Sequence, residues 1–152
     1  MSAAVPVPLP AAPLGVYAPP TLATFGLLWS LFGVMQLLQT LQSTPQSLQE
    51  MGMTPAQAAV YSSYPVWMTL GFAVGAFGGL IGSALLLARR RLATPVLLAS
   101  LVGYIVLYVG DITEGVFAAL GAPQVVVLTA VVLIAAGLLL WSRQLSQRGL
   151  LR

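Results

Sequence analysis

Two acidic side chains, Asp111 and Glu114, are the strongest candidates for chemistry in this sequence. They lie three residues apart in a long apolar stretch, so on a helix they would be neighbours on one face. A carboxylate in hydrocarbon is costly and by default marks a functional site. At about 1.5 Å per residue from Pro95, Asp111 lies roughly 24 Å along a layer about 30 Å thick, near its boundary. Three interpretations remain open: solvated acids, a hydrogen-bonded clamp between helices, or a site for a proton or a cationic substrate.

Other polar side chains share this region. Ser100, Tyr104 and Tyr108 fall on the Asp111 face of the same helix, within an arc of roughly 80°. An earlier apolar stretch carries a second polar face with Gln36, and Gln39 beside it. That face holds Trp29, Gly33, Gln36 and Thr40 within roughly 60°. We therefore predict a shallow polar pocket formed by Gln36, Gln39, Tyr104, Tyr108, Asp111 and Glu114.

The residue types that are absent remove several kinds of chemistry. The chain has no cysteine and no histidine, so thiolate catalysis, imidazole bases and the usual zinc and haem ligands are excluded. We expect no catalytic residues, no metal, no cofactor and no enzymatic activity. The net charge of +3 comes from arginines in two short groups, a pattern that does not support nucleic-acid binding.

The overall composition indicates a membrane protein. Of 152 residues, 59% are hydrophobic and only 6% are charged, against about a quarter charged in a soluble domain. Four apolar segments, at about 22–41, 66–88, 93–120 and 125–141, each reach the roughly 17–25 residues that a membrane-spanning helix needs. The predicted fold class is all-α, an integral membrane four-helix bundle over residues 21–142 in contact with the lipid bilayer.

The arginines predict the orientation of this bundle. Arg89, Arg90 and Arg91 lie between the second and third segments, and Arg143, Arg148 and Arg152 follow the fourth. Because basic residues favour the cytoplasmic side, these groups are topology determinants and both termini are expected inside, N-in/C-in. Residues 1–20 hold six of the eleven prolines and predict an extended arm, and residues 143–152 a short basic tail.

The longer outer loop, between the first two segments, contains a helix-start signal. Thr54 is followed by Pro55 and, at the third helical position, by Gln57, which is the form of a capping box. We predict a short interfacial helix here that ends before Pro65, with three aromatic anchors, Tyr61, Tyr64 and Trp67. This segment is either a loop held at the lipid headgroups or a cap over the bundle.

A glycine stripe marks the second segment. Gly71, Gly75, Gly78 and Gly82 fall within roughly 60° of one another on a helix. Stripes of small residues let a second helix backbone approach closely. The stripe therefore predicts either helix packing within the bundle or an interface with a partner subunit.

Several short motifs also carry a resemblance. They are Leu28-Trp29-x-Leu31-x-Gly33-Val34, Tyr64-Pro65-x-Trp67, Phe72-Ala73, Phe77-Gly78-Gly79-x-x-Gly82-Ser83 and Arg89-Arg90. Over about residues 25–105 the chain resembles small four-helix bacterial inner-membrane proteins, some of which are labelled sugar transporters. The resemblance implies a four-helix fold and a multi-pass location in the bacterial inner membrane, and it assigns no site residues.

Two functions are expected from these patterns. The first is a non-enzymatic structural or accessory subunit, which assembles with other membrane-protein subunits or with itself. It is favoured by the glycine stripe and by the scarcity of reactive residues. The alternative is a small oligomeric transporter that uses Asp111 and Glu114 as a cation or proton site.

Overall fold

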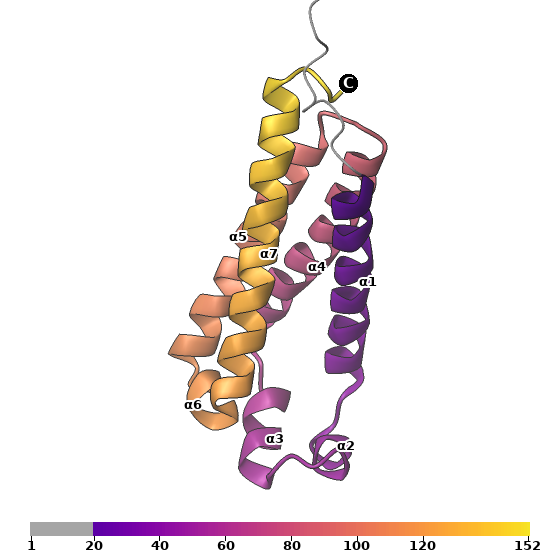
Figure 1. Cartoon of the computed structure of the whole chain (residues 1–152). Helices are drawn as coiled ribbons and strands as arrows, with labels where there is room; N and C mark the ends of the chain where they lie inside the picture. The colour runs from indigo at the N-terminus through magenta and orange to yellow at the C-terminus, as the bar shows by residue number, and fades with distance from the viewer. Residues whose placement is uncertain (1–19) are drawn as a thin grey trace, which may run out of the picture.

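The computed structural model describes residues 20–152, and this part of the chain is all-α. Four long helices are long and apolar enough to cross a membrane: α1 (Pro20–Gln42), α4 (Val66–Leu87), α5 (Ala93–Thr113) and α7 (Ala122–Gln147). They form the elongated bundle of Figure 1, which confirms the predicted four-helix fold class and makes the chain a multi-pass membrane protein. The predicted arm lies outside the described residues, apart from Pro20, which begins α1.

Two predicted helix boundaries differ from the structure. The third span was expected to continue to Leu120, but α5 ends at Thr113 and a separate short helix, α6 (Val116–Leu120), follows. Gly115 causes the break, because its φ of +72° is left-handed and ends the right-handed helix. The fourth span is longer than expected, since α7 runs to Gln147 and includes Arg143.

The four long helices do not close into a symmetric bundle. Helix α4 packs along both α1 and α5, and α5 packs along α7, while α1 and α7 make few contacts with each other. We call the end that carries Arg89–Arg91 and the C-terminus the arginine end. The opposite end, with α6 and two further short helices, α2 (Pro45–Glu50) and α3 (Pro55–Ser62), is the cap end (Figure 1).

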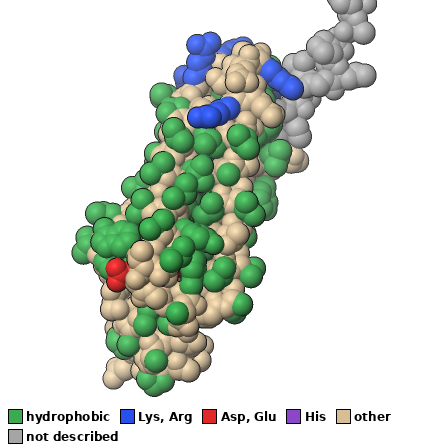
Figure 2. All heavy atoms as spheres, turned by 90° about the vertical axis from the view of Figure 1, so that its left-hand side faces the viewer, with side chains coloured by type: hydrophobic (Ala, Val, Ile, Leu, Met, Phe, Trp, Pro, Cys, Tyr) green, Lys and Arg blue, Asp and Glu red, His purple; other side chains and the backbone are tan. Residues whose placement is uncertain are grey.

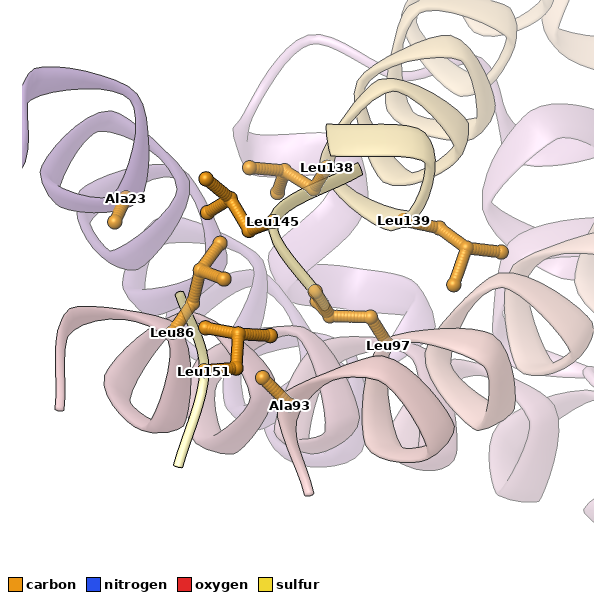
Figure 3. Packing of buried hydrophobic residues seen from close by; sticks show 8 residues of the cluster. All are labelled: Ala23, Leu86, Ala93, Leu97, Leu138, Leu139, Leu145 and Leu151. Carbon is orange, nitrogen blue, oxygen red and sulfur yellow. The ribbon is translucent and has the colours of Figure 1, made fainter. Parts of the chain in front are cut away.

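The arginine end is packed around an apolar cluster and contains a small pocket of about 50 Å³. A cluster of buried apolar residues draws on all four long helices and on the C-terminal tail (Figure 3); its members are Ala23, Leu86, Ala93, Leu97, Leu138, Leu139, Leu145 and Leu151. The tail is also bonded to the α4–α5 connection. The Arg152 N–H donates to the Arg89 carbonyl at 2.6 Å, and the Arg91 N–H donates to the Arg152 carbonyl at 2.8 Å.

The glycine stripe of α4 lies against α5. A Cβ atom added at Gly75 would come within 2.7 Å of the Tyr104 ring, and Gly78 and Gly82 face Ser100 and Leu97 in the same way. Helix α5 contributes a glycine of its own, because a Cβ on Gly103 would lie 2.6 Å from the carbonyl oxygen of Gly71. Packing within the bundle therefore accounts for the stripe, and this face is not open to a partner subunit.

The cap end contains the predicted short helix and one more. Helix α3 begins at the capping box of Thr54 and Gln57, as predicted, and α2 begins at an equivalent box on Thr44. Helix α3 is held against the bundle, since Gln57 Nε2 donates to the Ala119 carbonyl of α6 at 3.2 Å. The Tyr61 and Thr40 hydroxyls are 2.9 Å apart and join α3 to α1. Of the two interpretations, the arrangement corresponds to a cap.

Candidate functional site

A cleft opens between α1 and α7, where these helices diverge toward the cap end. It has a volume of about 120 Å³. Its aromatic lining comes from four elements of the fold: Trp29 and Phe32 of α1, Tyr61 and Tyr64 of the cap, Phe72 of α4 and Tyr104 of α5. Two amide side chains, Gln36 and Gln124, also line it. The aliphatic side chains of Leu107, Val127, Leu128 and Val131 complete this lining, so the cleft is aromatic and aliphatic with a few polar groups.

Asp111 lies directly behind the wall of this cleft. Its side chain is fully buried, with 0% of its surface exposed. Gln124 Nε2 donates to Asp111 Oδ2 at 2.8 Å, whereas Oδ1 is buried and has no hydrogen-bond partner among the described residues. The Tyr64 hydroxyl interacts with the same carboxyl group but outside regular hydrogen-bond geometry. Two lining residues, Gln124 and Tyr64, therefore connect the cleft to a buried acid.

The Tyr64 phenol is held in its neutral form. Burial raises its pKa far above the usual value of about 10, and the nearby charge of Asp111 raises it further. The neighbouring Tyr61 acts in the same direction, and the two ring centroids are 5.1 Å apart. At neutral pH, Tyr64 thus keeps the proton that it can donate toward the cleft or toward Asp111.

Gly33 makes room for Tyr104, a buried aromatic residue of the cleft. A Cβ atom at Gly33 would lie 3.3 Å from the Tyr104 hydroxyl, which is tighter than an ordinary contact. The predicted polar face of α1 is the face that lines the cleft, since Trp29, Gly33 and Gln36 all belong to it. Thr40, one turn further, instead bonds Tyr61 at the cleft mouth.

The structure brings together only part of the predicted polar pocket. Gln36 and Tyr104 line the cleft and Asp111 lies behind it. Gln39 is exposed and reaches the Met51 sulfur at 3.8 Å. Tyr108 lies in a different environment, because its hydroxyl is 3.2 Å from the Thr129 hydroxyl and its ring packs on Phe117.

Glu114 is separated from Asp111. It is the exposed C-cap residue of α5, whereas Asp111 points into the bundle. The Glu114 N–H still bonds the Gly110 carbonyl, so the helical turn is intact. Three residues correspond to about 300°, however, which places Glu114 about 60° away from Asp111 on the exposed side of the helix end. The two acids consequently do not form one site.

Sequence reasoning missed Gln124 and did not place two tyrosines in the cleft. Gln124 lies one residue before the predicted start of the fourth span and so falls outside the expected helices. A glutamine at the edge of an apolar helix is a signal that could have paired it with Asp111. Tyr61 and Tyr64 were predicted as interfacial anchors, but both line the cleft; Trp67 is 42% exposed.

Negative charge lies close to the cleft, at Asp111, and the positive charges lie far from it. None of its lining residues is cationic. The arginines lie in the α4–α5 connection and at or beyond the last turns of α7, and Figure 2 shows them gathered at the arginine end. No group of three or more metal-ligating side chains occurs in residues 20–152.

The fold and the cleft together define a multi-pass membrane protein with a small cleft between two of its spanning helices. Comparison with known proteins finds no matching family model, no similar curated protein and no similar solved structure. The resemblance to small inner-membrane proteins stays a prediction.

Proposed function

We propose that the protein binds a small molecule in the cleft between α1 and α7, with Asp111, Gln124 and Tyr64 as its polar recognition group. The observation that carries this proposal is the fully buried Asp111, whose Oδ1 atom has no hydrogen-bond partner in residues 20–152. An unsatisfied buried polar atom costs about 1–3 kcal/mol, and buried polar groups are normally bonded. Ionisable groups kept at such a cost in membrane helices are typically functional.

The lining of the cleft supports this function. Small-molecule sites are concave, mostly apolar and aromatic, and contain a few polar groups that orient the ligand. Trp29, Phe72 and Tyr104 provide such a wall, and Gln36 and Gln124 provide hydrogen-bonding groups. Binding between helices of a bundle is also a common location for ligand sites.

The cleft is reachable from the side of the bundle. Phe32 on one rim is 53% exposed and Val127 on the other is 56% exposed. Since α1 and α7 make few contacts with each other, a ligand can pass between them without disrupting the extensive packing of α4 on α1 and α5. The proposed site shares Asp111 with the transporter function expected from the sequence, but Glu114 is not part of it.

The accessory-subunit function stays a prediction with less support. Its main argument was the glycine stripe, and the stripe is covered by α5. The bacterial inner membrane and the N-in/C-in orientation also stay predictions.

Cysteine protection tests the proposed function. The chain has no cysteine, so a single Val127→Cys substitution places one thiol on the rim of the cleft. Val126→Cys is the matched control, because Val126 is 66% exposed on the same helix and does not line the cleft. The thiol is titrated with methyl methanethiosulfonate, a small neutral reagent, in dodecyl maltoside micelles.

The probes are choline and its neutral isostere 3,3-dimethylbutan-1-ol. We expect at least one of them to slow modification of Val127→Cys at about millimolar concentration, the range that so few ligand atoms can reach. Neither probe should protect Val126→Cys. If neither probe slows the reaction at Val127→Cys, the proposed binding site is refuted.

A further inference from the structure

We infer that the ligand of this cleft is a small monovalent organic cation of the alkylammonium type, recognised by aromatic side chains and by the charge of Asp111. This inference rests on the proposed function and adds the chemical class of the ligand. It follows from three observations: the aromatic lining, the unpaired acid behind it, and the volume of the cleft.

The aromatic lining provides the first argument. Six aromatic side chains from four parts of the fold converge on a single cleft, and none of its lining residues is cationic. The face of an aromatic ring attracts a cation within about 6 Å, and quaternary ammonium groups are typically recognised by several such rings. The three tyrosines among the six place hydroxyl oxygens in the lining, which can also accept hydrogen bonds from an ammonium ion that carries N–H groups.

The charge of Asp111 provides the second argument. Gln124 bonds only Oδ2, and the other oxygen has no donor among the described residues. The chain's arginines are at the opposite end of the bundle, so none of them neutralises this carboxylate (Figure 2). A cation in the cleft would stabilise the ionised form of Asp111 across the wall of Gln124 and Tyr64, whereas a neutral or anionic ligand would not.

The ligand set does not suit a calcium or magnesium ion as the natural occupant. Calcium and magnesium require several oxygen ligands, commonly more than one carboxylate. Here one buried carboxylate lies behind two lining side chains, and no cluster of acids occurs in residues 20–152. An alkylammonium ion does not need an inner shell of oxygen ligands.

The volume provides the third argument. A cleft of about 120 Å³ is smaller than the roughly 150 Å³ cavity that holds one benzene molecule, so it suits a compact head group. The remainder of a larger ligand can extend through the open side between α1 and α7. A free alkylammonium ion and the amine head group of a lipid both fit this description.

The comparison of choline with 3,3-dimethylbutan-1-ol tests the ligand class, because the two differ by one charged nitrogen in place of a carbon. At Val127→Cys we expect choline to give half-protection at about a tenfold lower concentration, which corresponds to about 1.4 kcal/mol. In the Asp111→Asn background this ratio should fall toward one, while protection by the neutral probe is retained.

The outcomes separate the two proposals. Equal protection by both probes in the otherwise wild-type protein would overturn the cation class but leave the binding site standing. Protection by neither probe would overturn both. If Asp111→Asn does not fold, the comparison of the two probes in the Val127→Cys protein still decides the ligand class.

Lipid addition distinguishes the two sources of the cation. Phosphatidylethanolamine added to the micelles should protect Val127→Cys by itself if a head group is the natural ligand, and phosphatidylglycerol should not. Protection by choline but by neither lipid indicates a free cation. Equal protection by both lipids would contradict recognition of positive charge.

Discussion

The carboxyl group of Asp111 depends on a single hydrogen bond, the one from Gln124 Nε2. Substitution Gln124→Met removes this donor with little change of volume and leaves the carboxyl group with only its irregular contact to the Tyr64 hydroxyl. We expect the free energy of unfolding to fall by about 1–3 kcal/mol. The measurement is unfolding in mixed micelles with increasing denaturing detergent. The same substitution in an Asp111→Asn protein should cost less, and an equal loss in both backgrounds would assign the effect to packing alone.

Tyr64 gives a prediction about alkaline pH. Its folded-state pKa is raised, first by burial and then by Asp111, whereas the unfolded chain ionises at about 10. The unfolded state therefore loses its proton first, so the stability contribution of Tyr64 is complete below pH of about 10 and is lost as pH rises above it. Stability should decline more steeply in the wild type than in Tyr64→Phe above this pH, measured by unfolding at stepped pH. Parallel declines would contradict the shift.

At the scale of elements, the contact between α4 and α5 depends on glycines from both helices. Gly103→Ala would place a methyl group 2.6 Å from the Gly71 carbonyl oxygen, which forces the two backbones apart. We expect a loss of about 1–3 kcal/mol in the free energy of unfolding. Gly137→Ala is the matched control, because nothing lies within 4 Å of the added atom. That change should be neutral or stabilise by up to about 1 kcal/mol. Similar effects at both positions would refute the close approach.

Local sequence signals predicted a helix correctly where a single physical effect, such as capping or apolar length, determines its start or its extent. The capping box at Thr54 predicted the start of α3, and apolar length predicted four spans. The same box at Thr44 was overlooked, because Ser47 is a less familiar partner than glutamine. The break after Thr113 was missed because Gly115 also fits a continuous membrane helix, and only its left-handed conformation ends α5.

The sequence predicted only those parts of the candidate site whose residues share one face of a single helix. Trp29, Gly33 and Gln36 share one face of α1, so their convergence follows from helical spacing. Gln124 and Tyr64 reach Asp111 from separate elements, and that meeting depends on how α7 and the cap pack against α5. Spacing along one helix carries no information about such tertiary contacts.

The orientation of the whole molecule gives a prediction that single cysteines can test. Ser62 at the cap end and Ser146 near the arginine end are both exposed, and the chain has no other thiol. If basic residues face the cytoplasm, an impermeant maleimide should label Ser62→Cys in intact cells and Ser146→Cys only after permeabilisation. The opposite pattern would invert the topology and place the cap inside the cell.

The two ends of the molecule differ in packing, with a cleft of about 120 Å³ toward the cap end and a pocket of about 50 Å³ at the arginine end. Leu151 is 1% exposed and packs in the cluster that joins the four long helices at the arginine end. Leu151→Ala should therefore cost about 2–5 kcal/mol of unfolding free energy, as in other buried leucine positions. Leu140→Ala is the control, since Leu140 is 59% exposed on α7 and should have a small effect.

Leu151→Ala also tests whether packing at the arginine end affects binding in the cleft. Leu151 lies in the arginine-end cluster and does not line the cleft. A Leu151→Ala protein that stays folded should consequently retain protection of Val127→Cys by choline, although it unfolds at lower denaturant. Loss of protection without loss of stability would mean that the tail controls the spacing of α1 and α7 along their full length. In that case the arginine end would regulate access to the site at the cap end.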